Sequence, residues 1–231
     1  VPTQEGSLYN VDMRLRPSGN AGPLVTKMTS FTAYQQNDAW TWEHMALTQA
    51  SVIAGSPDLV ARLNAVMVDV ICRRRDKSML ADDVEAMRRR LFEHQKIRGP
   101  LDVKNGSGGL IDIEFMIQAL VLAHAADCPA IATPRGLAET LKKLRAVDLL
   151  SRSDYELLLE AGSYYGALRQ ISGLCLEPDS DAIGQGATEM VLNAVHAPDP
   201  ARLQAQLGQF RDGISATFTR VMAGLRDQPP H

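Results

Sequence analysis

Apolar side chains recur at three- and four-residue intervals through most of this chain, and this periodicity constrains the fold more than any other feature. The longest case covers residues 199–226, where Asp199 is a helix N-cap residue and Pro200 suits the first turn. The apolar stripe of that segment comprises Leu203, Leu207, Phe210, Ile214, Phe218 (or Thr217), Val221 and Leu225. Such a stripe is typical of a helix with one face in a core.

The same periodicity predicts further helices over residues 28–36, 39–54, 78–95, 110–126, 134–148 and 153–174, and a weaker one near 187–196. Another begins at Ser56-Pro57, which supplies an N-cap and a proline at the first helical position. Ser78, Thr133 and Ser153 are the N-caps expected for three of the others. In residues 39–54, one stripe is expected to contain Trp42, Met45, Ala46, Gln49 and Ile53.

One segment near the N-terminus has a different period. Val11, Met13 and Leu15 alternate with Asp12, Arg14 and Arg16, which predicts a β-strand with an apolar face and a charged face. Pro17 ends the strand and residues 18–22 form a glycine-rich turn. A carboxylate that can hold a divalent cation, beside two guanidiniums that can hold phosphate oxygens, suits nucleotide chemistry. The alternative is a half-exposed strand with an internal Asp–Arg pair.

Together these patterns predict a mainly α protein, a helical bundle preceded by a small β remnant. Residues 1–27 are expected to be the end of one domain and residues 28–231 an all-helical domain. An isolated strand cannot satisfy its own backbone groups, so we expect its partner strands to precede this chain.

A second candidate site is the run Lys104-Asn-Gly-Ser-Gly-Gly109 before the helix at 110. Lys104 and the bare N–H groups of Gly106, Gly108 and Gly109 could bind an anion at a helix N-terminus. The run is not a P-loop, because no Lys-Ser/Thr follows the glycines. The alternative is a tight connection between helices. Asp112 and Glu114 then suit the helix N-terminus, and as residues two apart they face different sides and make a poor chelating pair.

The segment Trp40-Thr-Trp-Glu-His44 places two indoles beside a carboxylate. We expect Trp42 in the core, and Trp40 with Glu43 at a cleft or at an interface to a catalytic fragment. His44 is expected to be an ordinary buried or half-buried residue. The runs Arg73–Arg75 and Arg88–Arg90 are expected to be solvated helix ends, or to meet an acidic partner surface.

Charge and cysteine content narrow the functional classes. With 24 basic and 27 acidic residues the net charge is −3, so no general affinity for nucleic acid or an anionic membrane is expected. The 3 cysteines are scattered, without metal-site spacing, which favours a reducing cytoplasm. No apolar run approaches the ~20 residues of a membrane span.

Three motifs together resemble the bacterial glutamine synthetase adenylyltransferase family, whose members also remove AMP. They are Val-Asp-Met-Arg-Leu-Arg-Pro-Ser-Gly, Ala-Trp-Thr-Trp-Glu-His-Met-Ala-Leu and Lys-x-Gly-x-Gly-Gly-Leu-x-Asp-Ile-Glu-Phe. The match spans most of residues 8–175, in the family's order and spacing. The Trp-Thr-Trp-Glu-His version resembles the C-terminal, adenylylating unit of the two that the family carries.

This resemblance implies a catalytic domain like that of the polymerase-β superfamily, with Mg²⁺ held by three carboxylates. Asp12 stands where the third is expected. The first two belong to a Gly-Ser-x-Asp-x-Asp motif that does not occur in this sequence, so the chain alone is expected to be inactive. Arg14 and Arg16 would neutralise the phosphates of ATP. The implied partners are glutamine synthetase and a PII-type signalling protein. Two alternatives stay open: a non-catalytic docking module, or the deadenylylating, phosphorolytic unit.

Overall fold

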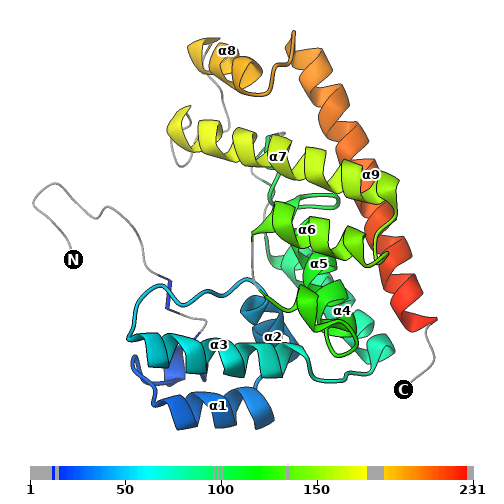
Figure 1. The fold of residues 1–231 in the computed structure, drawn as a ribbon. Coiled ribbons are helices and arrows are strands. Elements are labelled where there is room, and N and C mark those ends of the chain that lie inside the picture. The colour runs from blue at the N-terminus through cyan, green and yellow to red at the C-terminus, as the bar shows by residue number, and fades with distance from the viewer. Residues whose placement is uncertain are drawn as a thin grey trace, which may run out of the picture.

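The computed structural model describes residues 12–13, 16–95, 97, 99, 101–133, 136–175 and 185–227. Within these ranges the chain is almost entirely helical (Figure 1), which confirms the mainly α fold. The α-helices are α1 (Met28–Asn37), α2 (Thr41–Leu47), α3 (Pro57–Ile71), α4 (Lys77–His94), α5 (Leu110–His124), α6 (Leu137–Ala146), α7 (Arg152–Cys175), α8 (Gln185–Ala194) and α9 (Pro200–Arg226). Two short 3₁₀ helices are also present: Gly19–Ala21 precedes α1, and Pro129–Ile131 lies between α5 and α6.

The predicted β remnant finds no support in the described residues. None of them is in a strand, and Asp12 and Met13 have no regular secondary structure. Val11, Arg14 and Leu15 lie outside the described residues. The turn after Pro17 is present, because the amide of Gly19 donates to the Arg16 carbonyl at 2.8 Å. The proposed boundary between residues 27 and 28 stays a prediction, although α1 begins at Met28.

Helix α5 is the centre of the core. Most of its side chains are buried on every side, and α2, α4, α6, α7 and α9 pack against it. A helix that is apolar around its whole circumference is stable in water only when neighbours cover it completely. The amino-terminal end of α5 is therefore a fixed point to which the preceding glycine-rich run is attached.

Helix α9 crosses α4, α5 and α7 along one side of the bundle (Figure 1). Its predicted stripe is confirmed: Leu207, Phe210 and Ile214 are buried, and so are both Thr217 and Phe218. The predicted start is also confirmed, because the Asp199 carboxylate accepts from the amide of Arg202 at 2.8 Å.

The helix predicted over 39–54 was placed wrongly at its end, since α2 covers only Thr41–Leu47. The Thr48 hydroxyl donates to the Met45 carbonyl at 2.7 Å, and the amide of Ala50 turns back to the Leu47 carbonyl at 3.1 Å. This local bonding tightens the last turn and ends the helix. The expected stripe is lost with it: Met45 is 1% exposed, but Trp42 is 40% and Ile53 94% exposed, so Trp42 is not a core residue.

Three predicted N-caps were also wrong, each by a few residues. Asp76 caps α4 in place of Ser78, because its carboxylate accepts from the Met79 amide at 2.9 Å. Ser151 caps α7 in place of Ser153, accepting from the Asp154 amide at 3.0 Å. Helix α6 begins after Gly136 rather than at Thr133. The Ser56 cap of α3 is confirmed by the bond from the Leu59 amide at 3.3 Å.

His44 on α2 joins α1 to the end of α3. Its Nε2 lies 3.0 Å from the carbonyl of Gln35, so Nε2 carries the proton and Nδ1 accepts from Arg75 Nη2 at 3.4 Å. Arg75 also donates to the carbonyls of Val70 and Ile71 at the end of α3. Burial lowers the pKa of His44, and the positive charges of Arg75 and Arg73 lower it further. Burial, with Arg73, also lowers the pKa of Arg75, to about 10.

We expect this histidine to make the fold sensitive to mild acid. Because its pKa in the folded chain lies below the unfolded value of about 6.5, the unfolded state binds the proton more tightly. Stability is therefore complete above about pH 7 and falls as the pH drops toward about 5. Urea unfolding of the wild type and His44→Gln across this range measures the effect. The free energy of unfolding should change less with pH in His44→Gln than in the wild type. An equal pH dependence in both proteins would contradict this role of His44.

Candidate functional site

The glycine-rich run 104–109 is held in a defined shape before it enters α5. Gly106 and Gly108 have positive φ values of 83° and 72°, a region that favours glycine. The Asp102 carboxylate accepts from the amides of Lys104 and Asn105 at 3.2 and 3.1 Å. The amide of Gly109 donates to the Gly106 carbonyl at 3.2 Å. Much of the hydrogen-bonding capacity of this run is therefore used inside the chain.

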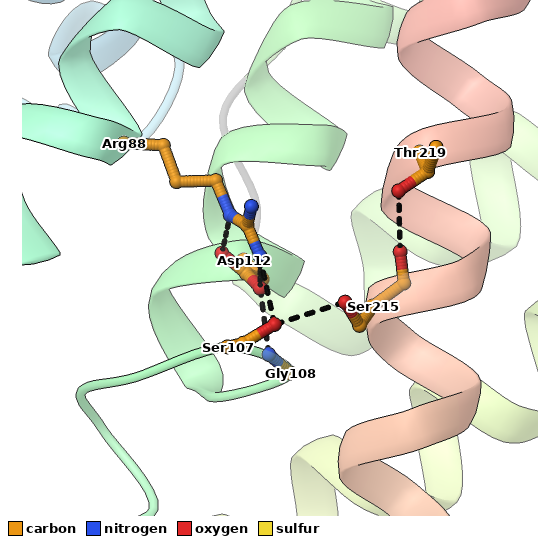
Figure 2. A network of polar contacts seen from close by, with 6 residues as sticks. All are labelled: Arg88, Ser107, Gly108, Asp112, Ser215 and Thr219. Atoms are coloured by element: carbon orange, nitrogen blue, oxygen red, sulfur yellow. Dashed lines mark hydrogen bonds and ion pairs between the residues drawn. The ribbon is translucent and has the colours of Figure 1, made fainter.

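The centre of the site is an ion pair between α4 and α5 (Figure 2). Arg88 donates through Nε to Asp112 Oδ1 and through Nη2 to Asp112 Oδ2, both at 2.6 Å. The Asp112 side chain is 0% exposed and that of Arg88 is 20% exposed. Asp112 Oδ2 also accepts from the amide of Gly108 at 2.7 Å. The buried Asp112 carboxylate thus holds both α4, through Arg88, and the glycine-rich run, through Gly108, at the start of α5.

Arg88 is packed on both sides as well as paired. Its guanidinium lies 4.7 Å from the ring centre of Phe92 and 4.5 Å from that of Phe218 on α9. Its Nη2 donates to the Ser107 hydroxyl at 3.1 Å, and that hydroxyl lies 2.9 Å from the Ser215 hydroxyl on α9 (Figure 2). Arg88 also lines an open pocket of about 550 Å³ along α4.

Gly108 is wedged between α7 and α9. The Tyr165 hydroxyl donates to the Gly108 carbonyl at 3.1 Å, and burial raises the pKa of Tyr165 to about 12, so it stays a donor. A Cβ atom at Gly108 would lie 2.1 Å from the backbone oxygen of Arg211. The position therefore requires glycine for its φ angle and for the close approach of α9.

This bonding bears on the predicted anion contact. The amide of Gly108 faces Asp112 and that of Gly109 faces Gly106, whereas the amides of Gly106 and Ser107 have no acceptor among the described residues. Lys104 is exposed. Close packing accounts for Gly108 on its own, and the contact of this run with a nucleotide stays a prediction.

The two acidic residues of early α5 lie in different environments, and their spacing predicted that they would face different sides of the helix. Asp112 faces the interior, whereas Glu114 is half-buried on another side of the helix. Burial raises the pKa of Glu114, and the positive charges of Arg169 and Lys104 oppose that rise. Glu114 forms no hydrogen bond with a described residue.

The structure describes only some of the N-terminal candidates. Asp12 is exposed, and Arg14 lies outside the described residues. The Arg16 guanidinium donates to the carbonyls of Met13 and Gly22 at 2.7 and 3.1 Å, so it closes the turn that follows Pro17. With a longer bond from Nη2 to the Asn20 carbonyl at 3.4 Å, three of the five guanidinium N–H groups are used within the described residues, and the other two could still donate to a phosphate.

Trp40 and Glu43 occupy contrasting environments at the start of α2. Trp40 is 70% exposed, whereas Glu43 is 5% exposed. The Glu43 carboxylate accepts from the Tyr34 hydroxyl at 2.8 Å and from the amide of Trp40 at 2.9 Å. Glu43 thus ties α1 to α2, and of these two residues Trp40 is the one that presents a large apolar surface.

Sequence reasoning missed Arg88 and Tyr165. The run Arg88–Arg90 was expected to be solvated, which is wrong for Arg88. A signal existed, because Arg88 follows the buried Val84 by one helical turn and therefore shares its inward face. A carboxylate at the start of the following helix was the available partner.

Within the described ranges, no three His, Cys, Asp or Glu side chains lie together in a group that could hold a metal ion. Asp12 supplies one carboxylate, which does not make a magnesium site by itself. In the same ranges no helix is long and apolar enough to cross a bilayer.

Comparison with known proteins agrees with the three motifs. The family model described as glutamate-ammonia ligase adenylyltransferase matches residues 1–66, and that of GlnD PII-uridylyltransferase matches residues 77–171. The chain is 38% identical over 224 residues to the bifunctional glutamine synthetase adenylyltransferase/adenylyl-removing enzyme of Rhodopseudomonas palustris CGA009, covering 96% of this chain. The predicted family resemblance is confirmed.

Related enzymes give the same result. The enzyme of the same name from Bradyrhizobium sp. ORS 278 is 38% identical over 222 residues, and that from Rhizobium meliloti 1021 is 36% identical over 227 residues. The chain spans 22% of the length of the Rhodopseudomonas enzyme and 23% of the Rhizobium enzyme. The similarity therefore describes one segment of these adenylyltransferases.

Proposed function

We propose that this chain is part of a nucleotidyltransferase that transfers AMP from ATP to a tyrosine of glutamine synthetase, and so regulates nitrogen metabolism. The observation that carries the proposal is the 38% identity over 96% of the chain to enzymes named for adenylyl transfer to glutamine synthetase and adenylyl removal from it. The match includes the helical part as well as the first 66 residues that the adenylyltransferase family model covers.

In this proposal residues 1–27 end the catalytic domain and residues 28–231 form a helical domain beside it. Asp12 is one carboxylate ligand of Mg²⁺, and Arg14 and Arg16 neutralise phosphate charge. The other carboxylates come from protein outside this chain. The Trp40-Thr-Trp-Glu-His44 segment supports the adenylylating unit over the adenylyl-removing one.

A second candidate function is a docking module for glutamine synthetase or a PII-type protein. Two observations favour it: the 70% exposure of the Trp40 indole, and the match of residues 77–171 to a family named for PII uridylylation. Exposed tryptophan side chains are frequent anchors of protein–protein interfaces. This candidate requires binding without AMP transfer.

The two candidates differ in an AMP-transfer assay. Radiolabelled ATP and glutamine synthetase are incubated with this chain, and separately with a longer enzyme that contains this chain and the Gly-Ser-x-Asp-x-Asp motif. We expect incorporation only with the longer enzyme, because one carboxylate cannot bind two metal ions. AMP transfer by this chain alone would contradict the proposal that the other carboxylate ligands of Mg²⁺ come from protein outside this chain.

In the longer enzyme, Asp12→Asn should lower kcat by about 10²-fold or more, the scale expected when a metal ligand or a base is lost. Circular dichroism should show an unchanged helix content, because Asp12 is exposed. The matched control is Asp58→Asn at another exposed aspartate, which should retain the wild-type rate. A near-normal rate in Asp12→Asn would remove Asp12 from the catalytic site.

A further inference from the structure

Lys104 and Glu114 are brought together by the way the glycine-rich run enters α5. The amide of Ile111, in the first turn of α5, donates to the Lys104 carbonyl at 3.3 Å. Glu114 follows Ile111 by three residues, so it lies one turn further along the same side of the helix. Lys104 therefore lies next to the first turn of α5, on the side of the helix to which Glu114 belongs.

Arg169 reaches the same place from α7. The bond from the Tyr165 hydroxyl to the Gly108 carbonyl fixes α7 against the glycine-rich run. Arg169 follows Tyr165 by four residues and shares its side of the helix. The positive charges of Arg169 and Lys104 both oppose the rise in the pKa of Glu114 that burial causes, which agrees with this arrangement of the two helices and the glycine-rich run.

These three side chains are not hydrogen-bonded or ion-paired to one another or to any other described residue. Asp112, two residues before Glu114, is fully bonded, but Glu114 has no hydrogen bond or ion pair with a described residue. The Lys104 ammonium and the Arg169 guanidinium likewise have no bonded partner in the described part of the chain, and both are exposed. Among these three side chains there are two cations and one carboxylate; the Asp102 carboxylate is also near, but it is bonded to the amides of Lys104 and Asn105.

We propose that Lys104 and Arg169 form a binding site for the phosphate groups of a ligand, and that Glu114 is the opposing charge that limits its affinity. The site deepens the proposed function and rests on it only for the natural ligand, the polyphosphate of ATP. An ammonium and a guanidinium are both strong donors to phosphate oxygens. A carboxylate beside them repels the same anion, so its removal should strengthen binding.

Isothermal titration calorimetry of this chain with inorganic pyrophosphate, at low ionic strength and without metal, tests the site. Lys104→Met and Arg169→Met should each weaken binding about tenfold, the loss of one charge-assisted hydrogen bond. Glu114→Gln should strengthen binding about three- to tenfold, from the loss of one like charge at a partly solvated site. Lys142→Met and Arg62→Met, at exposed positions of α6 and α3, are the matched controls and should bind as the wild type does.

The variants are expected to change the affinity for pyrophosphate in opposite directions, and this makes the test decisive. Absence of pyrophosphate binding by the wild type, wild-type affinity in Lys104→Met and Arg169→Met, or weaker binding in Glu114→Gln would each overturn the site. Thermal unfolding of each variant without ligand shows whether it folds. The titration uses no glutamine synthetase and measures no turnover, so its failure would be distinct from failure of the AMP-transfer assay.

Discussion

Replacing Asp112 by alanine will lower the free energy of unfolding by about 3–5 kcal/mol, the usual cost of removing one partner of a buried ion pair. The change leaves the Arg88 guanidinium between two aromatic rings without its counter-charge, and it removes the acceptor of the Gly108 amide. Urea unfolding followed by circular dichroism measures the loss. A change below about 1 kcal/mol, the scale of an exposed pair, would contradict the role given to this carboxylate.

Two further variants separate charge from packing. Arg88→Met with Asp112→Leu should recover much of the lost stability, because apolar pairs of similar volume often replace buried ion pairs at little cost. Asp58→Ala is the surface control, since its pair with Arg62 spans 3.4 Å between side chains that are 78% and 58% exposed. That control should change stability by less than about 0.5 kcal/mol.

Gly108→Ala will destabilise the chain by about 3 kcal/mol or more, from left-handed backbone strain combined with overpacking. The new methyl group would meet the Arg211 backbone at 2.1 Å, where no side-chain rotation can relieve the collision. Chemical denaturation gives the magnitude. Near-wild-type stability would show that α9 does not approach this glycine as described.

Gly106→Ala is the matched control for that variant. Gly106 also has a positive φ, of 83°, but the nearest atom to a new Cβ is Ile97 Cδ1 at 3.3 Å, the end of a flexible side chain. Backbone strain alone should cost about 1 kcal/mol there. The difference between the two glycine variants isolates the contact with α9.

Much of the helical framework could be predicted from the sequence, because periodicity and capping are local signals. The start of α9 at Pro200 and the Ser56 cap of α3 are examples. The end of α2 was missed because Thr48 and the residues after it bond to nearby carbonyls, and the periodicity of apolar residues does not reveal such bonds.

The candidate site was predicted only in part, for a related reason. The glycine-rich run and Asp112 stand out in the sequence, and the two-residue spacing of Asp112 and Glu114 predicted that they face different sides of α5. Arg88 and Tyr165 are 24 and 57 residues away from their partners, so only the packing of α4 and α7 against α5 brings them there. Long-range pairing of this kind leaves no local pattern.

The contact between Ser107 and Ser215 joins positions 108 residues apart. The glycine-rich run therefore acquires its final shape only after α9 has been synthesised and has docked, since Ser215 and the Arg211 backbone complete its surroundings. Contacts of such sequence separation form late, because the chain between them must first be closed into a loop. On the ribosome, α5 emerges well before the helix that finishes its amino-terminal end, and during that interval its apolar surface is open to other chains.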